Sequence, residues 1–261
     1  MPSGVVLLTD RWQARRPLIE VVEAAVAGGV RWVVLREKDL SRAERAALAA
    51  QLRVILADAD GRLIVAGPDP LDGDAVHLPA AGPYPPPAVG LVGRSCHDAA
   101  ELARLTTEDY VTLSPVFPTR TKPGYGPPLH PAGLRALIAA IPVPVLALGG
   151  IETPDQVRES VAAGATGVAV LGALMRADDP TEIAAKLTEA AGRTDHRMPR
   201  PAPTPAAAVP TAVTPVTTSP SLPADASTSG LRPTVPTQGS SLTARSGHGR
   251  PQPSTATKEP T

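Results

Sequence analysis

Hydroxyl and cationic side chains are concentrated in one short stretch near the middle of the chain, residues 114–126. Within it, Thr119, Arg120, Thr121 and Lys122 place two hydroxyls and two positive charges on consecutive positions. Two nearby glycines would let backbone N–H groups approach a ligand closely. Such groups bind phosphate or pyrophosphate, so the stretch predicts an anion-binding loop. A solvated loop with incidental charge is the alternative, and the surrounding elements must decide between the two.

The composition bears on the compartment and on the classes of partner. The 261 residues include 25 basic and 25 acidic side chains, so net charge gives no support for a nucleic-acid or anionic-membrane partner. Cys96 is the only cysteine, which excludes an intramolecular disulfide and disfavours a cysteine-based zinc site. No apolar run reaches membrane-spanning length, and the first residues lack the pattern of a secretory signal. We therefore expect a cytoplasmic protein with no nucleic acid and no membrane among its partners.

The composition changes sharply near Arg193. We expect one folded unit over residues 1–193 and a disordered tail over residues 194–261, which are rich in Pro, Ser, Thr and Ala. Such a tail buries too little apolar surface to offset the conformational entropy that is lost on ordering. An inert extension and an interaction arm are both consistent with this composition.

Short apolar runs, typical of buried strands, alternate with helical patterns along residues 1–193. The runs predict strands at residues 5–8, 32–35, 63–65, 75–78, 91–93, 110–113, 144–148 and 167–170. Helical spacing, caps and stops predict helices at residues 17–27, 41–57, 95 or 98 to 104, 131–141, 154–163, 172–175 and 180–191. The links 66–73 and 79–87 are too rich in proline for a full helix.

Eight strands with intervening helices or helix remnants predict an α/β protein, a (β/α)8 TIM barrel. An open, doubly wound sheet is the alternative. In a TIM barrel the active site lies at the carboxyl ends of the strands, and a phosphate often binds after strands seven and eight. The Gly149-Gly150 and Leu171-Gly172 turns occupy those two places. They are therefore the predicted phosphate site.

A second anion site is expected from cations and hydroxyls at other strand ends: Arg36, Lys38, Thr119, Thr121 and Lys122. Arg36 and Lys38 have the same strand parity, so both should point to one side of the chain. The alternative for this pair is a surface turn in which each cation pairs with a neighbouring acidic residue.

Four further residues near strand ends have both a structural and a chemical interpretation. Ser95 is expected either as a helix N-cap or as a donor to a ligand. His77 ends a short strand and suits a structural role or a base. His97 is expected in the first turn of a helix, and Cys96 as a packing residue, since no base is arranged beside it.

Seven short motifs, taken together in their order along the chain, resemble those of the thiamine-phosphate synthase and thiazole tautomerase (TenI-like) superfamily. The resemblance covers residues 5–191 and implies a (β/α)8 barrel. In this family the synthase joins hydroxymethylpyrimidine diphosphate to a thiazole phosphate and releases pyrophosphate, using Mg²⁺. The motifs are Leu8-Thr9-Asp10, Leu35-Arg36-Glu37-Lys38, Val76-His77-Leu78, Gly93-Arg94-Ser95-Cys96-His97, the loop from Pro115 to Lys122, Ala147-Leu148-Gly149-Gly150-Ile151 and Gly167-Val168-Ala169-Val170.

The resemblance implies a role for each matching position. Arg36, Lys38 and Lys122 match residues that hold the pyrimidine diphosphate and act in catalysis, and Ser95 matches a further residue at that substrate. The positions implied at the thiazole phosphate are Thr119, Thr121, Gly150, Leu171 and Gly172, with Gly149 adjoining them. Phosphorylated pyrimidine and thiazole compounds are the implied small-molecule partners, and an oligomer is an open expectation.

The expected metal ligands are missing from the matching positions. Ala66, Gly67 and Gly82 stand where synthases carry an Asn-Asp pair and a second Asp, so no residue is predicted as a metal ligand and Mg²⁺ is expected through the resemblance alone. Asp69, Asp72 or Asp74 could substitute only through a shifted loop. Synthases also carry Gln at the position of Val34, and the tautomerase branch carries a catalytic His at that of Pro115.

Three functions therefore stay open. The loop from Pro115 to Lys122 favours a thiamine-phosphate synthase, a transferase of thiamine biosynthesis. The missing metal ligands favour a thiazole phosphate tautomerase, in which His77 or His97 would serve as the base. A non-catalytic paralogue that binds a phosphate ligand is the third hypothesis.

Overall fold

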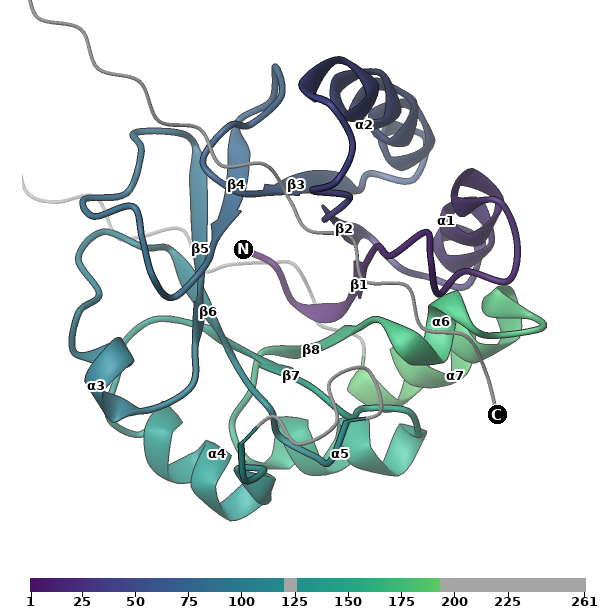
Figure 1. The fold of residues 1–261 in the computed structure, drawn as a ribbon. Helices are drawn as coiled ribbons and strands as arrows, with labels where there is room; N and C mark the ends of the chain where they lie inside the picture. Colours follow the sequence, from purple (N-terminus) through teal and green to yellow (C-terminus); the bar gives the residue numbers. More distant parts are fainter. Residues whose placement is uncertain (120–125, 193–261) are drawn as a thin grey trace, which may run out of the picture. The chain divides into compact units, whose positions relative to one another are not determined.

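Eight parallel strands close into a barrel (Figure 1) in the computed structural model, which describes residues 1–119 and 126–192. Neighbours in sequence pair in space from the first strand to the eighth, and the eighth pairs back with the first. The closed sheet confirms the predicted TIM barrel and excludes the open doubly wound alternative. The strands are β1 (Gly4–Leu8), β2 (Trp32–Leu35), β3 (Arg62–Ala66), β4 (Ala75–Leu78), β5 (Leu91–Cys96), β6 (Tyr110–Leu113), β7 (Val145–Leu148) and β8 (Gly167–Val170).

The helices lie outside the sheet, and two of them begin at the capping residues that the sequence predicts, Ser41 and Thr153. Ser41 and Glu44 form a reciprocal capping box at the start of the longest helix, and Thr153 with Gln156 forms another. The helices are α1 (Leu18–Ala27), α2 (Arg42–Ala57), α3 (Ala99–Leu102), α4 (His130–Ile138), α5 (Pro154–Ala162), α6 (Gly172–Met175) and α7 (Pro180–Ala191). None of the described helices is long and apolar enough to cross a membrane.

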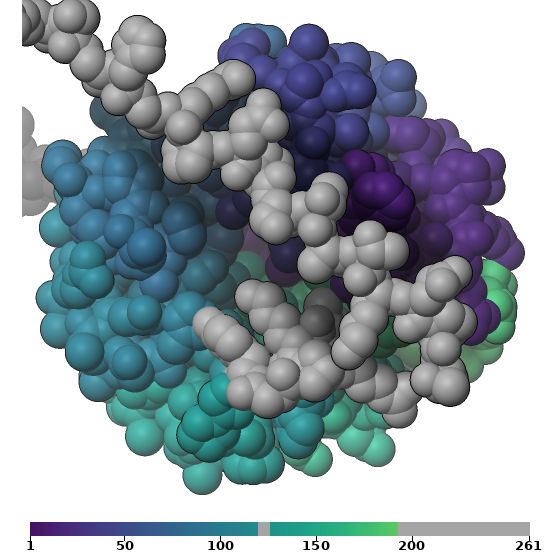
Figure 2. All heavy atoms as spheres, viewed as in Figure 1, coloured from purple at the N-terminus to yellow at the C-terminus, as the bar shows by residue number. Residues whose placement is uncertain are grey.

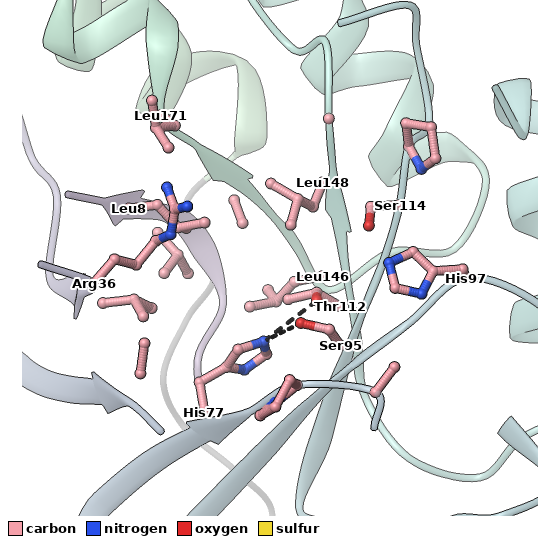
Figure 3. Close-up of a pocket in the computed structure, with 18 of the residues that line it drawn as sticks. Leu8, Arg36, His77, Ser95, His97, Thr112, Ser114, Leu146, Leu148 and Leu171 are labelled. Atoms are coloured by element: carbon pink, nitrogen blue, oxygen red, sulfur yellow. Dashed lines mark hydrogen bonds between the residues drawn. The ribbon is translucent and has the colours of Figure 1, made fainter. Parts of the chain in front are cut away.

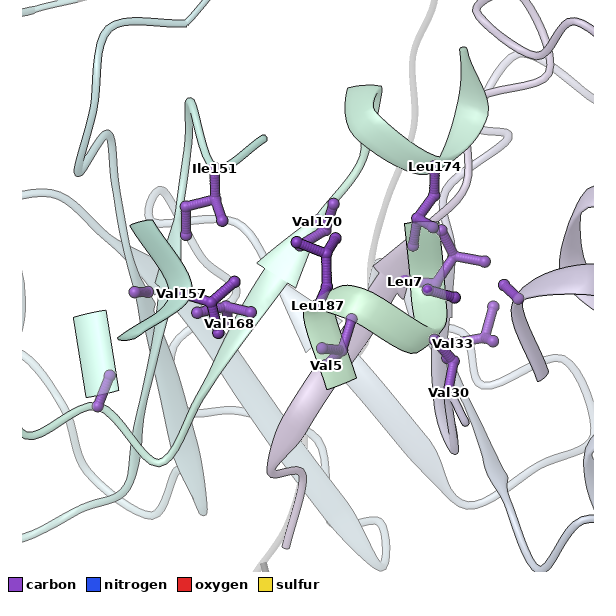
Figure 4. Packing of buried hydrophobic residues seen from close by; sticks show 14 of the residues in the cluster. Val5, Leu7, Val30, Val33, Ile151, Val157, Val168, Val170, Leu174 and Leu187 are labelled. Atoms are coloured by element: carbon purple, nitrogen blue, oxygen red, sulfur yellow. The ribbon is translucent and has the colours of Figure 1, made fainter. Parts of the chain in front are cut away.

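Alternate strand residues build two apolar layers. Outward side chains such as Val5 and Val168 pack beneath the helices, where Leu187 of α7 meets them (Figure 4). Inward side chains such as Val6 and Ile64 fill the barrel itself. Figure 2 shows the purple atoms of α1 beside the green atoms of the last helices, which contact it and complete the ring. This packing accounts for the predicted strand runs, which are apolar on both faces.

Two loops replace helices after β3 and β4, as the proline-rich links predict. A buried guanidinium holds the second of them. Arg94 of β5 donates to the carbonyl oxygens of Pro79 and Pro83, at 3.0 and 2.8 Å, and pairs with Glu108. The side chains of Arg94 and Glu108 are both 0% exposed. Arg94 also lies over the ring of Tyr84, 3.9 Å from its centre, so one cation fastens the loop to the barrel.

The structure corrects the predicted ends of β5 and α3 and both ends of α4. The strand predicted at 91–93 continues to Cys96, so Ser95 lies inside the sheet and is not a helix cap. Asp98 is the cap of α3, which ends at Leu102 rather than Arg104. His97 therefore precedes the helix instead of lying in its first turn. Helix α4 begins one residue before its predicted start, at His130, and ends at Ile138 rather than Ile141.

Candidate functional site

A cavity of about 740 Å³ opens among the carboxyl ends of the strands (Figure 3). Its size is typical of sites for small-molecule ligands, about 300–1,000 Å³. The predicted site residues that the structure describes all line it: Arg36, Lys38, His77, Ser95, His97, Thr119, Gly149, Gly150, Leu171 and Gly172. Thr121 and Lys122 lie outside the described residues, as does the predicted tail. Residues that are far apart in sequence thus meet in one place.

Arg36 and Lys38 line the cavity because their acidic neighbours turn the other way. Glu37 and Asp39 both accept hydrogen bonds from the guanidinium of Arg11, at 3.0 and 2.7 Å respectively. The hydrogen bond from Arg11 also holds the pKa of Asp39 well below its usual range. The acids of this segment are therefore held by Arg11, while the two cations line the cavity just beyond the end of β2. The pairing of both acids with Arg11 argues against a surface turn in which they neutralise Arg36.

Hydroxyl groups surround His77 in the lower part of the cavity. Its Nε2 lies 3.0 Å from Ser95 Oγ and 3.5 Å from Thr112 Oγ1, and its Nδ1 lies 3.1 Å from the Tyr110 hydroxyl. Figure 3 shows the three side chains of His77, Ser95 and Thr112 converging, with Arg36 projecting from beyond the end of β2. The geometry decides the open choice for Ser95, which faces the cavity as a hydrogen-bonding group.

These groups are neutral at physiological pH. Burial lowers the pKa of His77 to about 3, and the positive charges of Lys38, Arg94 and Arg36 add to the effect. Burial likewise raises the pKa of Tyr110 above its usual value. A group with so low a pKa is a weak base at neutral pH, which argues against His77 as the base of a tautomerase. The lower cavity is better suited to hydrogen-bond a neutral polar ring.

The lowered pKa of His77 predicts a pH dependence of stability. Between pH 6.5 and about 3 the unfolded imidazole binds a proton and the folded one does not, so the free energy of unfolding should fall as pH drops through that range. The slope from this group should reach about 1.4 kcal/mol per pH unit. In urea titrations at several pH values, His77→Gln should lose this part of the slope. Parallel curves for the two proteins would contradict the assignment.

His97 is the second histidine of the cavity and has a different setting. Its Nδ1 lies 2.7 Å from Glu101 Oε2, and its backbone N–H donates to the same oxygen at 2.8 Å. The carboxylate fixes the ring from two directions and orients it at the cavity wall. A carboxylate-oriented imidazole is an arrangement suited to general acid or base chemistry. Cys96, in contrast, packs in the outer apolar layer, and burial raises its pKa to about 12, which confirms its packing role.

Gly149 and Gly150 let two loops lie against each other. Both have positive φ, 98° and 70°. A Cβ on Gly150 would stand 2.4 Å from the Pro118 carbonyl oxygen, and one on Gly149 would stand 2.9 Å from Pro115 Cα. The Phe117 N–H donates to the Gly149 carbonyl at 3.0 Å. The glycines therefore fix the loop after β6 beside the loop after β7, which brings Thr119 to the cavity. Their contact with a phosphate stays a prediction.

Sequence reasoning missed Arg176, a cation at this rim of the cavity. Its Nη1 donates to Gln13 Oε1 at 2.7 Å and its Nη2 to Glu152 Oε1 at 2.9 Å. The guanidinium lies over Gly172, where a Cβ would come within 2.3 Å of it. The spacing could have indicated this cation. Arg176 follows the predicted site residue Gly172 by four positions, and one helical turn returns it to the same face.

The carboxylates at the cavity do not fit a magnesium site held by the protein. Glu101 and Glu152 are the acidic side chains that line it among the described residues, and each faces a partner, His97 or Arg176. No group of three or more His, Cys, Asp or Glu in residues 1–119 and 126–192 could hold a metal ion. Magnesium is usually held by one or two carboxylates together with substrate phosphates and water, and both described carboxylates that line this cavity are engaged by other side chains.

The three candidate replacements are also used elsewhere. Asp69 and Asp72 pair with Arg42, at 2.8 and 3.7 Å, and Asp74 pairs with Arg62 at 2.7 Å. None of the three lines the cavity. The idea that one of them substitutes for a lost metal ligand is therefore not supported by the described geometry.

Comparison with known proteins gives a consistent set of relatives. Residues 5–174 match the family model described as thiamine monophosphate synthase. A putative thiamine-phosphate synthase of Geobacter sulfurreducens is 40% identical over 201 residues, which cover 70% of this chain and 92% of the relative. A thiamine-phosphate synthase of Moorella thermoacetica is 33% identical over 202 residues, covering 72% and 95%.

A solved structure agrees with these relatives. Thiamine phosphate pyrophosphorylase from Pyrococcus furiosus superposes with a TM-score of 0.63 at 27% identity, covering 72% of this chain and 95% of that one. A geranylgeranylglyceryl phosphate synthase from Thermoplasma acidophilum, at 13% identity and a TM-score of 0.52, shares the fold alone.

Proposed function

The chain belongs to the thiamine monophosphate synthase family, and on that premise we propose that it couples hydroxymethylpyrimidine diphosphate to a thiazole phosphate, with release of pyrophosphate. The observation that carries the proposal is the meeting of the described candidate residues in one cavity. Arg36 and Lys38 enter it from β2, and the glycine turns border it at β7 and β8. The enzyme is a transferase of thiamine biosynthesis.

The reaction makes demands that this cavity meets. The bond between the pyrimidine methylene carbon and the diphosphate oxygen breaks, and its electron pair leaves with pyrophosphate. The thiazole nitrogen supplies the pair for the new carbon–nitrogen bond. Arg36 and Lys38 would stabilise the charge that grows on the departing diphosphate, because fixed cations act strongly in a site that excludes water. Lys122 is proposed to join them.

The other two parts of the substrates would bind at separate places. The hydroxyls around His77, with Ser95 among them, suit the nitrogens and amino group of a neutral pyrimidine. The thiazole phosphate would lie against Thr119, Thr121, Gly149, Gly150, Leu171 and Gly172. Arg176 would add a positive charge at that end, where it already lies over Gly172.

The proposal is tested with the full chain and both substrates. We expect thiamine phosphate and pyrophosphate to appear in equal amounts, measured by chromatography and by a phosphate assay after pyrophosphatase treatment. No thiamine phosphate at an enzyme concentration equal to that of the substrates would overturn the synthase function.

A tautomerase is the second candidate, because Glu101 orients His97 at the cavity wall. In that case a proton would be removed from one position of the thiazole phosphate and returned at another, without a pyrimidine substrate. His97→Gln should then abolish isomerisation of the thiazole phosphate while coupling, if present, persists. Isomerisation that survives this substitution would exclude His97 as the base.

A further inference from the structure

The acidic side chains around the cavity mouth are turned away or paired. Glu37 and Asp39 face Arg11 on the far side of the chain from Arg36. Glu152, which does line the cavity, accepts from Arg176. The residues between the two described segments, 120–125, contain no Asp or Glu in their sequence. Glu101, the other lining carboxylate among the described residues, lies against His97. A divalent cation would therefore find few carboxylate oxygens here that are not already engaged by another side chain.

A guanidinium also occupies the end of β3, at the level where the family's metal ligands are expected. Arg45 reaches from α2 and donates from Nη2 to the Ala66 carbonyl oxygen at 2.8 Å. Its Nε is buried with no hydrogen-bond partner in the described part of the chain. Ala66 itself lines the cavity. A fixed positive charge beside this strand end repels a metal ion and attracts an anion.

The cavity lining is positive overall. Arg36, Lys38, Arg104 and Arg176 line it, against the carboxylates of Glu101 and Glu152. The remaining lining residues are apolar or carry neutral polar groups, apart from the two histidines. Such a balance is suited to a multiply charged anion, which arginine and lysine can bind through charge-assisted hydrogen bonds.

We propose that the diphosphate end of this site is magnesium-independent, with the protein's own cations neutralising the anion directly. Arg36 and Lys38 contact the diphosphate, and Arg45 acts from behind Ala66 as a fixed charge in place of a metal ion. The proposal deepens the proposed function and rests on it for the identity of the substrate. It differs from the resemblance, which implies Mg²⁺ held by aspartates that this chain does not have.

The test measures binding of inorganic pyrophosphate to the full chain by calorimetry, first with EDTA and then with Mg²⁺, at equal ionic strength. We expect Mg²⁺ to raise the affinity for pyrophosphate by no more than about threefold over the affinity measured in EDTA. An affinity that rises with Mg²⁺ by more than about threefold, or no binding in either buffer, would overturn the proposal.

Variants of single residues identify the cations that bind pyrophosphate. In EDTA, Arg36→Gln should weaken pyrophosphate binding at least about tenfold, and Arg45→Gln should weaken it less, because Arg45 acts through Ala66 and not by contact. Arg62→Gln is the matched control, because Arg62 pairs with Asp74 outside the cavity. This variant should bind pyrophosphate as tightly as the unchanged protein. Equal affinities for all the variants would also overturn the proposal.

Binding and turnover separate this proposal from the synthase function. A chain that binds pyrophosphate in EDTA but makes no thiamine phosphate under any condition contradicts the synthase alone. A chain that makes thiamine phosphate but binds pyrophosphate only with Mg²⁺ contradicts magnesium independence alone.

Discussion

Replacing Arg36 by Gln should lower kcat/KM for coupling roughly 100- to 1,000-fold, the usual cost of removing one group that stabilises transition-state charge. The reason is geometric. Arg36 lines the cavity from the end of β2, where its backbone N–H donates to the buried Thr9 hydroxyl at 2.9 Å. Its side chain makes no ion pair with the other residues that the structure describes, so the loss should fall on the reaction rather than on folding.

Steady-state kinetics with both substrates measure the effect. Arg62→Gln serves as the control, because it removes the same charge from the opposite end of a neighbouring strand. Arg36→Lys should recover part of the loss, since charge returns without the two-pronged geometry of the guanidinium. If Arg36→Gln keeps kcat/KM within about threefold of the unchanged protein, Arg36 is not a catalytic residue.

Replacing Arg94 by Leu should destabilise the protein by about 3–5 kcal/mol, the range for breaking a buried ion pair on one side. Glu108 would be left with its charge inside the protein, and the loop at 79–90 would lose the donors to Pro79 and Pro83. Urea unfolding followed by circular dichroism gives the free energy. A loss below about 1 kcal/mol would mean that water reaches Glu108 and that the pair is not buried in solution.

The double variant Arg94→Leu with Glu108→Leu separates the two causes. It should be more stable than Arg94→Leu alone, because no unpaired charge remains. The single variant should also respond to pH. Burial favours a higher pKa for Glu108, but the hydrogen bonds from the Thr106 N–H and Arg94 hold that pKa below its usual value. The stability from this carboxylate is therefore present above its unfolded pKa and is lost as pH falls, and Arg94→Leu should weaken that dependence.

Most of the barrel could be predicted because its signals are local. The strands are short apolar runs that are buried on both faces. The capping boxes at Ser41 and Thr153 mark the starts of two helices, and each box is contained in four consecutive residues. The missing helices after β3 and β4 follow from proline, which cannot donate in a helix. Placing Arg36 and Lys38 in the cavity needed only strand parity and the rule for the active face of a barrel.

The end of β5 could not be predicted from local signals. Arg94 and Ser95 are polar and suggest a loop, yet they pair in register with Val111 and Thr112 of β6. Ser95 is polar because it faces the cavity, and Arg94 because it meets Glu108 on the outside. Both reasons are contacts distant in sequence.

The packing of Tyr110 was hidden for the same reason. Its ring fills the barrel above Gly93, where a Cβ would come within 2.1 Å of it. No residue near Gly93 in the sequence indicates that this glycine contacts an aromatic ring seventeen positions away. The pairing of β5 with β6 brings the two residues together, and it makes the tyrosine hydroxyl available to His77.

The alternation of charge from Arg36 to Asp39 also constrains how this protein can change over evolutionary time. Inserting one residue between Leu35 and Arg36 would shift the segment by one position, which should turn Glu37 and Asp39 toward the cavity and the two cations away from it. The cavity would lose two of the four cations that line it in the described part of the chain, Arg36 and Lys38, and gain two carboxylates. Selection should therefore remove length changes within these four positions more strictly than charge-preserving substitutions such as Asp39→Glu.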